Sequence, residues 1–180
     1  MHRLFVALRP PPEIRDQLLE TMDLVAAARW QDEEQLHLTL RFIGSVERPV
    51  AEDVVAALSQ VRGPTMSIAL SGVGQFERRG RTDALWAGVT PHDALSALNR
   101  KIDRALVRTG LEPERRTYLP HVTLARFSRG NGSASEAERW LARHARLTSP
   151  VFEIRHFGLY ESHLAHEGAR YEVVERWALA

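Results

Sequence analysis

A short pattern occurs twice in the chain, and each copy carries a histidine followed two positions later by a threonine. The first copy is His37-Leu38-Thr39-Leu40 and the second is His121-Val122-Thr123-Leu124, with the two histidines 84 positions apart. Successive side chains of a strand point to opposite faces, so the imidazole and the hydroxyl share one face and apolar side chains share the other. Two such strands side by side would form a cleft lined by two histidines and two threonines.

Two imidazoles that titrate near neutral pH can serve as one general base and one general acid in the same turnover. A threonine hydroxyl beside each ring can donate to a non-bridging oxygen of a phosphate held between them. In-line displacement at phosphorus needs a base on the attacking side and an acid on the leaving side, and a related pair of strands supplies both. We therefore identify His37 and His121 as catalytic candidates, and Thr39 and Thr123 as phosphate-binding candidates.

Two alternatives must be weighed against this interpretation. Histidine and threonine are common structural residues on half-buried strands, and it is their repetition on two apolar-backed strands that favours chemistry. A metal site is the other alternative, but a catalytic zinc normally has three protein ligands. Neither motif carries a third histidine or a carboxylate on the same face, so we predict no metal. The segment Gly72-Val73-Gly74 lacks the spacing and the lysine of a nucleoside-triphosphate loop, so we expect no ATP and no other cofactor.

Hydrophobic spacing, together with proline and glycine positions, predicts the elements that must position the motifs. The expected strands are 3–9, 35–43, 66–70, 84–89, 119–127, 151–161 and 169–178, and the expected helices are 14–25, 50–61, 91–110 and 135–146. Each half of the chain has a helix before its motif strand, a helix after it, and a pair of strands later. We interpret this order as an internal duplication in one α+β domain, residues 1–180, with two pseudo-symmetric lobes and a mainly antiparallel sheet.

The composition describes an ordinary soluble globular protein, with 44% hydrophobic and 26% charged residues. A net charge of +1 argues against a general polyanion binder, and the lack of cysteine excludes disulfides, thiolate metal sites and cysteine nucleophiles. No apolar run reaches the length of a membrane span, and the N-terminal segment is too short and too soon followed by prolines for a signal peptide. We therefore expect a monomeric, cytoplasmic protein with no membrane partner.

Beyond the two motifs, several further segments carry a family resemblance. They are Arg3-Leu4-Phe5-Val6-Ala7, Leu36 to Gly44, Leu85 to Val89, Pro120 to Arg126, Leu159 to Ser162 and Gly168 to Tyr171. With these segments, the chain resembles the bacterial and archaeal RNA 2′,3′-cyclic phosphodiesterases, also called 2′–5′ RNA ligases, from residue 3 to about 178. These proteins are a branch of the two-histidine phosphoesterase superfamily.

The resemblance implies that each lobe is a curved antiparallel sheet with helices on its outer side, and that the motif strands line a cleft between the lobes. It implies metal-independent hydrolysis of an RNA or nucleoside 2′,3′-cyclic phosphate to a 2′-phosphate. His37 would protonate the departing 3′ oxygen and His121 would activate water, while Thr39, Thr123 and Arg126 would hold the phosphate. Reversible 2′–5′ ligation, a phosphodiesterase restricted to small nucleotides, and a nucleotide-binding module without catalysis remain alternatives.

Arginines near the motifs are the remaining candidates for RNA contacts. Arg126 lies five positions after the second motif histidine, where strict alternation puts it on the apolar face, so a bulge or the strand end must redirect it. Arg41 lies four positions after the first motif histidine and alternates toward the cleft. The segment between the third and fourth predicted strands is a polar hairpin or loop that could bind upstream phosphates through Arg78, Arg79 and Arg81. The alternative for this segment is a solvated loop whose arginines bind nothing.

Overall fold

The computed structural model describes residues 1–128 and 133–180, and it confirms the α+β class. The elements, in chain order, are β1 (His2–Leu8), α1 (Pro12–Leu19), β2 (Arg29–Trp30), the 3-10 helix η1 (Glu33–Gln35), β3 (Leu38–Val46), α2 (Arg48–Leu58), β4 (Met66–Arg78), β5 (Arg81–Thr90), α3 (Asp93–Val107), β6 (His121–Arg126), α4 (Ala134–His144), β7 (Phe152–Ile154), β8 (His156–Ala165) and β9 (Gly168–Ala178).

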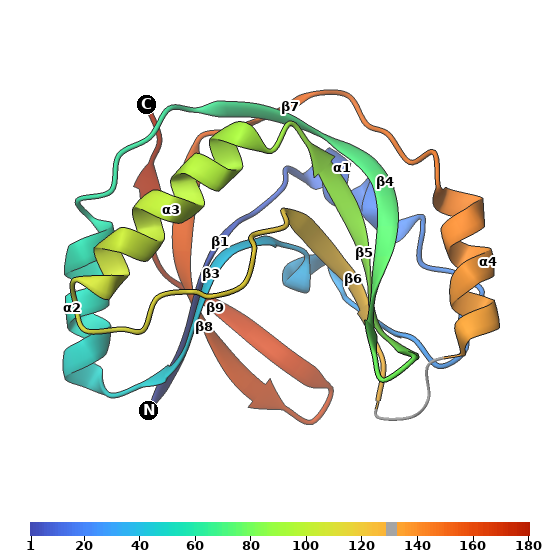
Figure 1. Cartoon of the computed structure of the whole chain (residues 1–180), viewed down its shortest axis with the longest axis horizontal. Helices are drawn as coiled ribbons and strands as arrows, with labels where there is room; N and C mark the ends of the chain where they lie inside the picture. Colours follow the sequence, from blue (N-terminus) through green and yellow to red (C-terminus); the bar gives the residue numbers. More distant parts are fainter. Residues whose placement is uncertain (129–132) are drawn as a thin grey trace.

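The strands form a single curled antiparallel sheet in the order β7-β4-β5-β6-β3-β1-β8-β9, with β2 attached to β6. Figure 1 shows the sheet arching over a concave side, with α2, α3 and α4 outside the arch. The antiparallel sheet and the outer helices are thus as expected. The division into two lobes is not confirmed, because the hydrogen-bonded path runs continuously from one half to the other through Leu38 on β3 and Val122 on β6.

The main apolar core lies between the outer helices and the convex face of the sheet. The apolar residues of the two motifs, together with the residue just before the first motif, are at most 2% exposed: Leu36, Leu38, Leu40, Val122 and Leu124. Burial of one such side chain contributes about 1.5–3 kcal/mol. A one-residue slip of either strand would move this apolar set to the cleft face, so the core fixes which face the motif histidines occupy.

The first helix is shorter than expected, because the sequence predicts it over 14–25 and α1 ends at Leu19. The Thr21 hydroxyl donates to the Leu18 carbonyl, and the Trp140 indole of α4 donates to the Thr21 carbonyl at 2.8 Å. The same carbonyl also accepts from the Asp23 N–H at 3.0 Å, so the chain turns tightly here instead of continuing the helix. Leu24 then adopts a left-handed backbone conformation with φ 54°, and Val25 reaches the core from a loop.

Two long hairpins extend from the sheet on the same side of the arch, one formed by β4 and β5 and the other by β8 and β9 (Figure 1). The predicted polar segment 77–83 is the end of the first hairpin. The strands are longer than the predicted 66–70 and 84–89, because β4 continues to Arg78 and β5 begins at Arg81. The hairpin closes through Arg79 and Gly80 with φ values of 52° and 74°. Two positive φ values are typical of a two-residue hairpin turn whose twist matches that of the strands. No helix in the described ranges is long and apolar enough to cross a membrane.

Candidate active site

The two motifs meet at the centre of the sheet. Leu38 of β3 pairs with Val122 of β6 in antiparallel register. Because both residues of this pair face the core, the residues on either side of each point to the opposite face. His37, Thr39, His121 and Thr123 therefore flank one buried pair on the concave side of the sheet. The Leu38–Val122 pair marks an approximate two-fold axis between the motifs.

His37 lies just before β3, whereas the sequence predicts it inside a strand that begins at 35. The chain approaches it through η1, which is closed by a capping box. The Asp32 carboxylate accepts from the Gln35 backbone N–H at 2.9 Å, and the Gln35 side-chain oxygen accepts from the Asp32 N–H at 3.0 Å. The Gln35 amide also donates to the Ala169 carbonyl on β9 at 2.6 Å. These bonds fix the backbone immediately before the first catalytic candidate.

Both motif histidines are held in the same way. The Nδ1 of His37 lies 2.6 Å from the Gln35 carbonyl oxygen, and the Nδ1 of His121 lies 2.7 Å from the Leu119 carbonyl oxygen. A carbonyl oxygen only accepts hydrogen bonds, so each Nδ1 must carry the proton. In the neutral rings Nε2 is then the unprotonated nitrogen, and in each imidazolium Nε2–H is the free donor. Both rings therefore present the atom that proton transfer requires.

A β-bulge follows each motif at the same place. Thr39 pairs with Ala7 and Arg41 with Val6, so Leu40 has no partner on β1. In the second motif, Leu124 likewise has no partner on β5, which pairs with the residues on either side of it. An extra residue reverses the alternation of the strand beyond it. Positions four after each histidine consequently face the core, and positions five after it face the cleft.

The bulges determine which face of the sheet is occupied by Arg41 and Arg126, the two arginines predicted to contact the substrate. Arg126 is redirected into the cleft, where it lines the same hollow as His37 and Thr39. Arg41 points the other way, and the expectation that it faces the cleft is wrong. Its side chain is 8% exposed and its Nε donates to Asp103 of α3 at 2.7 Å. Phe42 takes the cleft position of the first motif and packs against the Arg3 guanidinium, 5.5 Å from the ring centre.

The cleft has a volume of about 580 Å³ and a cationic lining. Arg3, Arg29 and Arg126 lie along it, and Glu167 is the acidic residue of the lining. Arg29 and Arg126 are direct partners on β2 and β6. Like charges at directly opposite sheet positions are mutually destabilising, and a bound anion would relieve that repulsion. The motif signals did not indicate Arg3 and Arg29, because their roles depend on strands distant in sequence.

Aromatic rings surround each histidine. The His37 ring lies 4.8 Å from Phe5 of β1 and 5.2 Å from Tyr171 of β9. The His121 ring lies 5.0 Å from Phe76 of β4 and 5.8 Å from Trp86 of β5, and these two rings contact each other at 5.6 Å. These rings limit the motion of the imidazoles and lower the local polarity.

This packing shifts the titration of both histidines. Burial is the main cause that lowers the pKa of His37 from its usual 6.5 to about 4; the hydrogen bond to the Gln35 backbone opposes it, and the charges of Arg126, His121 and Arg9 add to it. Burial also lowers the pKa of His121, with a further contribution from Arg126. Both rings are therefore predominantly neutral at pH 7 in the ligand-free protein. An anion between them would favour protonation of either ring.

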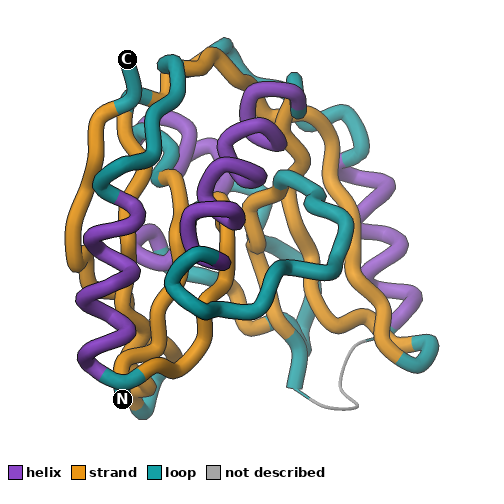
Figure 2. Tube along the Cα trace, turned by 60° about the vertical axis from the view of Figure 1, so that its left-hand side comes forward, coloured by secondary structure: helices purple, strands orange, loops and turns teal. Residues whose placement is uncertain are grey.

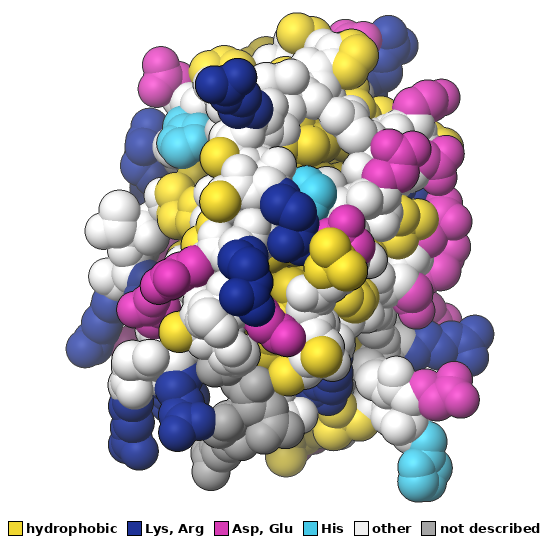
Figure 3. All heavy atoms as spheres, turned by 90° about the vertical axis from the view of Figure 1, so that its right-hand side faces the viewer, with side chains coloured by type: hydrophobic (Ala, Val, Ile, Leu, Met, Phe, Trp, Pro, Cys, Tyr) yellow, Lys and Arg dark blue, Asp and Glu magenta, His cyan; other side chains and the backbone are white. Residues whose placement is uncertain are grey.

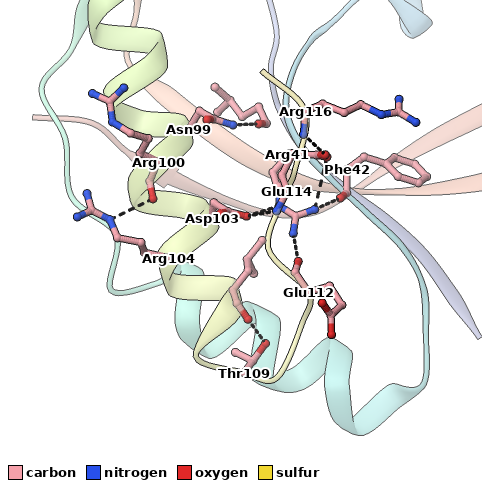
Figure 4. Close-up of polar contacts among 12 residues, drawn as sticks. Arg41, Phe42, Asn99, Arg100, Asp103, Arg104, Thr109, Glu112, Glu114 and Arg116 are labelled. Carbon is pink, nitrogen blue, oxygen red and sulfur yellow. Dashed lines mark hydrogen bonds and ion pairs between the residues drawn. The ribbon is translucent and has the colours of Figure 1, made fainter. Parts of the chain in front are cut away.

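A connection on the outer face runs from α3 to the second motif, and Figure 4 shows the polar contacts that Arg41 makes with it. The segment 108–120 leaves α3, crosses the outer side of the sheet (Figure 2) and enters β6. Arg41 anchors its start by donating to the Glu112 carbonyl, and Asp103 accepts from the Glu114 N–H at 3.1 Å. At its end the Tyr118 hydroxyl donates to the Thr39 carbonyl at 3.1 Å. The next residue, Leu119, supplies the carbonyl that accepts from His121, so Arg41 and Tyr118 hold the segment that carries this carbonyl.

The three hairpin arginines lie apart from the cleft. Arg78, Arg79 and Arg81 line a separate hollow of about 410 Å³ with Phe127 and Ser128. The face of the molecule that includes α4 and this hairpin interleaves basic and acidic side chains (Figure 3). The structure therefore brings together His37, Thr39 and Arg126 in one cleft, with His121 and Thr123 across the register, and leaves the hairpin arginines peripheral. Their contact with RNA stays a prediction.

No group of three or more histidine or acidic residues that could hold a metal ion occurs within 1–128 and 133–180. His37, Thr39 and three arginines line the cleft, and the Arg126 charge acts on both motif imidazoles. Such a set can move two protons and neutralise a phosphate.

Comparisons with known proteins show the family of the chain. Residues 10–165 match the family model of the 2′-5′ RNA ligase superfamily. The chain is 30% identical to the RNA 2′,3′-cyclic phosphodiesterase of Escherichia coli strain K12, over 98% of this chain and 96% of that protein. It is 31% identical to the RNA 2′,3′-cyclic phosphodiesterase of Aeropyrum pernix, over 79% of this chain and 81% of that protein.

Solved structures resemble the whole chain. The structure of Escherichia coli LigT complexed with 3′-AMP matches with a TM-score of 0.79 and 28% identity, covering 99% of this chain and 98% of that one. A structure described as a phosphoesterase matches with a TM-score of 0.80 and 28% identity, at the same coverage. The family resemblance expected from the two motifs is thereby confirmed.

Proposed function

Since the chain belongs to the 2′-5′ RNA ligase superfamily, we propose that its cleft hydrolyses the 2′,3′-cyclic phosphate of an RNA end or a nucleotide to a 2′-phosphate. The relatives described above are named RNA 2′,3′-cyclic phosphodiesterases. The reaction needs a base, an acid and cationic or hydroxyl groups around the phosphorus. The motif residues supply all three types of group.

In this proposal His121 is the general base and His37 is the general acid. The Nε2 of His121 takes a proton from water while the water oxygen bonds to phosphorus. The P–O3′ bond breaks, and the Nε2–H of His37 gives its proton to the departing 3′ oxygen. The product is a 2′-phosphomonoester with a free 3′ hydroxyl. Exchange with solvent then returns His121 to the neutral form and His37 to the protonated form.

The phosphate is held by groups that neither gain nor lose a proton. The hydroxyls of Thr39 and Thr123 donate to its non-bridging oxygens, and Arg126 neutralises its charge. The paired guanidinium groups of Arg29 and Arg126 support an anion at this position, because their mutual repulsion falls when one binds.

One observation carries the proposal most directly. Each motif histidine donates its Nδ1–H to the carbonyl two residues earlier, so Nε2 of each ring is left free for proton transfer. The two rings come from strands that pair with each other at Leu38 and Val122. A pair of merely structural histidines would have no reason to share this arrangement. A nucleotide-binding module without catalysis would need the cleft but not the two matched tautomers.

Substrate size, reversible ligation, location and oligomeric state belong to the same proposal. We infer that RNA ends as well as small cyclic nucleotides are substrates. Ligation would occur when a 5′ hydroxyl takes the place of water: its oxygen bonds to the phosphorus of the cyclic phosphate, the P–O3′ bond breaks, and a 2′–5′ phosphodiester with a free 3′ hydroxyl forms; attack by that 3′ hydroxyl reverses the step. We also infer a monomer in the cytoplasm, which the cysteine-free sequence supports through its compatibility with a reducing compartment. Light scattering coupled to size-exclusion chromatography tests the monomer.

A substrate panel tests the proposed activity. The protein, treated with EDTA, is incubated with a nucleoside 2′,3′-cyclic phosphate, an oligonucleotide ending in a 2′,3′-cyclic phosphate, and a nucleoside 3′,5′-cyclic phosphate. Phosphorus NMR identifies the product. We expect turnover of the first two substrates to the 2′-phosphate, and none of the third. A 3′-phosphate product would reverse the assignment of the leaving oxygen, and binding without turnover would favour the nucleotide-binding alternative.

A further inference from the structure

A second basic hollow lies on the concave side of the sheet, next to the cleft. It has a volume of about 270 Å³, and Arg9, Tyr160 and Arg176 are among its lining residues. Phe5 and Tyr160 belong to a small apolar cluster separate from the main core, so they lie on the cleft side of the sheet. A stack of rings leads to it from the catalytic centre. His37 is 4.8 Å from Phe5, and Phe5 is 5.5 Å from Tyr160 at an interplanar angle of 15°.

Small residues form the floor of this hollow. Gly158 of β8 pairs with Ala7 of β1 on one side and with Arg176 of β9 on the other. A Cβ at Gly158 would lie 2.9 Å from the Tyr160 ring and 3.2 Å from the Arg176 side chain. The absence of a side chain at this position therefore lets the phenol and the guanidinium stem lie over the strand. Any larger residue would displace one of them.

The hollow carries uncompensated positive charge. Arg155 is neutralised by Glu153 at 2.7 Å, and Arg9 contacts the exposed carboxylate of Glu34 at 3.3 Å. Arg176, in contrast, forms no ion pair within residues 1–128 and 133–180.

The Tyr160 hydroxyl lies in the field of both guanidinium groups. Burial raises the pKa of Tyr160, while the charges of Arg176 and Arg9 lower it. Two guanidinium groups and one hydroxyl donor around a small hollow suit a phosphate.

We propose that Arg9, Tyr160 and Arg176 bind a second phosphate of the substrate, the one on the 5′ side of the terminal nucleotide. This inference rests on the proposed function. Successive phosphates of an RNA strand are separated by one nucleoside, and here two stacked rings separate the catalytic imidazole from the guanidinium groups. The contact reads the backbone and carries no base preference. It distinguishes an RNA end from a cyclic mononucleotide that lacks a 5′-phosphate.

A matched pair of small substrates isolates this contact. One is a nucleoside 2′,3′-cyclic phosphate and the other is the same compound with a 5′-phosphate. Hydrogen bonds to charged groups contribute enough for us to expect kcat/KM of the native protein to be about ten-fold higher for the 5′-phosphorylated compound. In Arg176→Gln that preference should fall to about two-fold or less, and Tyr160→Phe should reduce it by a smaller factor.

The control is Arg108→Gln, which removes an exposed guanidinium next to the C-terminal end of α3 and should keep the ten-fold preference. Retention of the full preference in Arg176→Gln, or an equal loss with both substrates, would overturn the second site. If the preference instead disappears when Arg78, Arg79 and Arg81 are changed, the contact with the 5′-phosphate belongs to the hairpin and the proposed second site is wrong.

A binding measurement keeps the inference separate from the proposed function. Calorimetry compares a nucleoside 2′-phosphate with the corresponding 2′,5′-bisphosphate, and neither is turned over. The bisphosphate should bind about ten-fold more tightly to the native protein, and this advantage should be lost in Arg176→Gln. If the native protein hydrolyses neither cyclic compound, the proposed function fails, while the calorimetric comparison still decides the second phosphate site. Equal affinity for the two ligands would refute it.

Discussion

Lowering the pH from 7 toward 5 should raise the kcat/KM of this protein for a cyclic nucleotide. The proposed acid, His37, must be protonated to act, yet burial holds its pKa near 4 in the free protein. The proposed base, His121, must be neutral, and burial also lowers its pKa below the usual 6.5. The protonation state needed for catalysis is therefore scarce at neutral pH and becomes more common in acid.

The pKa of His37 sets the size of the change in kcat/KM. With a pKa of about 4, about one molecule in a thousand carries the His37 imidazolium at pH 7. Each unit of acidification should raise kcat/KM about ten-fold, until His121 itself becomes protonated. The profile should thus be bell-shaped, with its maximum below pH 6.5, and it reports the apparent values of the pair. Exchanging the acid and base roles leaves this shape unchanged.

The assay measures initial rates with a nucleoside 2′,3′-cyclic phosphate from pH 4 to 8 at constant ionic strength. The profile of kcat should have its maximum at higher pH than that of kcat/KM, because the bound phosphate favours protonated imidazole. Arg126→Gln should move the kcat/KM maximum upward, since Arg126 lowers the pKa of both histidines. Arg108→Gln should not move it. A kcat/KM maximum above pH 7, or a flat profile between pH 5 and 7, would contradict an acid–base pair whose pKa values are lowered by burial.

Three further predictions concern stability, positioning and RNA length. Because the pKa of His37 is about 4 in the folded protein and 6.5 in the unfolded chain, the free energy of unfolding should fall by up to about 3 kcal/mol as the pH drops from 6.5 to 4. Denaturant titrations should show a smaller fall in His37→Gln and the full fall in the exposed control His92→Gln. Tyr118→Phe should lose about 1 kcal/mol of stability with the hydroxyl bond to the Thr39 carbonyl and lower kcat more than it raises KM, and an unchanged kcat would remove Tyr118 from positioning. Changing Arg78, Arg79 and Arg81 to alanine should raise the oligonucleotide KM and flatten its salt dependence, by about 0.7 in log–log slope for each phosphate that the hairpin no longer neutralises; equal effects on a cyclic mononucleotide would leave these arginines without an RNA role.

Most helices and strands could be predicted because local sequence patterns determine them. The alternation of His37-Leu38-Thr39-Leu40 and its repeat is enough to define two strands with an apolar back. The helices follow from apolar spacings of three and four, as in α3, where Leu95, Leu98 and Ile102 are buried. The pairing of strands across the whole sheet could not be predicted in this way. No local pattern indicates that β3 and β6, at the centre of the sheet, join through a single residue pair.

The features that could not be predicted depend on partners distant in sequence. The bulges at Leu40 and Leu124 exist because β1 and β5 skip those residues, and simple alternation consequently misplaces Arg41. For Arg126 the sequence indicates only that some irregularity is needed. The aromatic rings beside the histidines come from four other strands, so their sequence positions carry no signal of the site.

The most direct test of two-histidine catalysis removes one motif histidine at a time in the absence of metal ions. Native protein, His37→Gln and His121→Gln are treated exhaustively with EDTA, shown to be folded by thermal melting, and assayed for hydrolysis of an RNA end that carries a 2′,3′-cyclic phosphate. We expect full activity of the chelated native protein and a loss of about 10²- to 10⁴-fold in each variant. Near-native turnover by either variant, or native activity that disappears with EDTA and returns with a divalent ion, would contradict metal-free catalysis by two histidines.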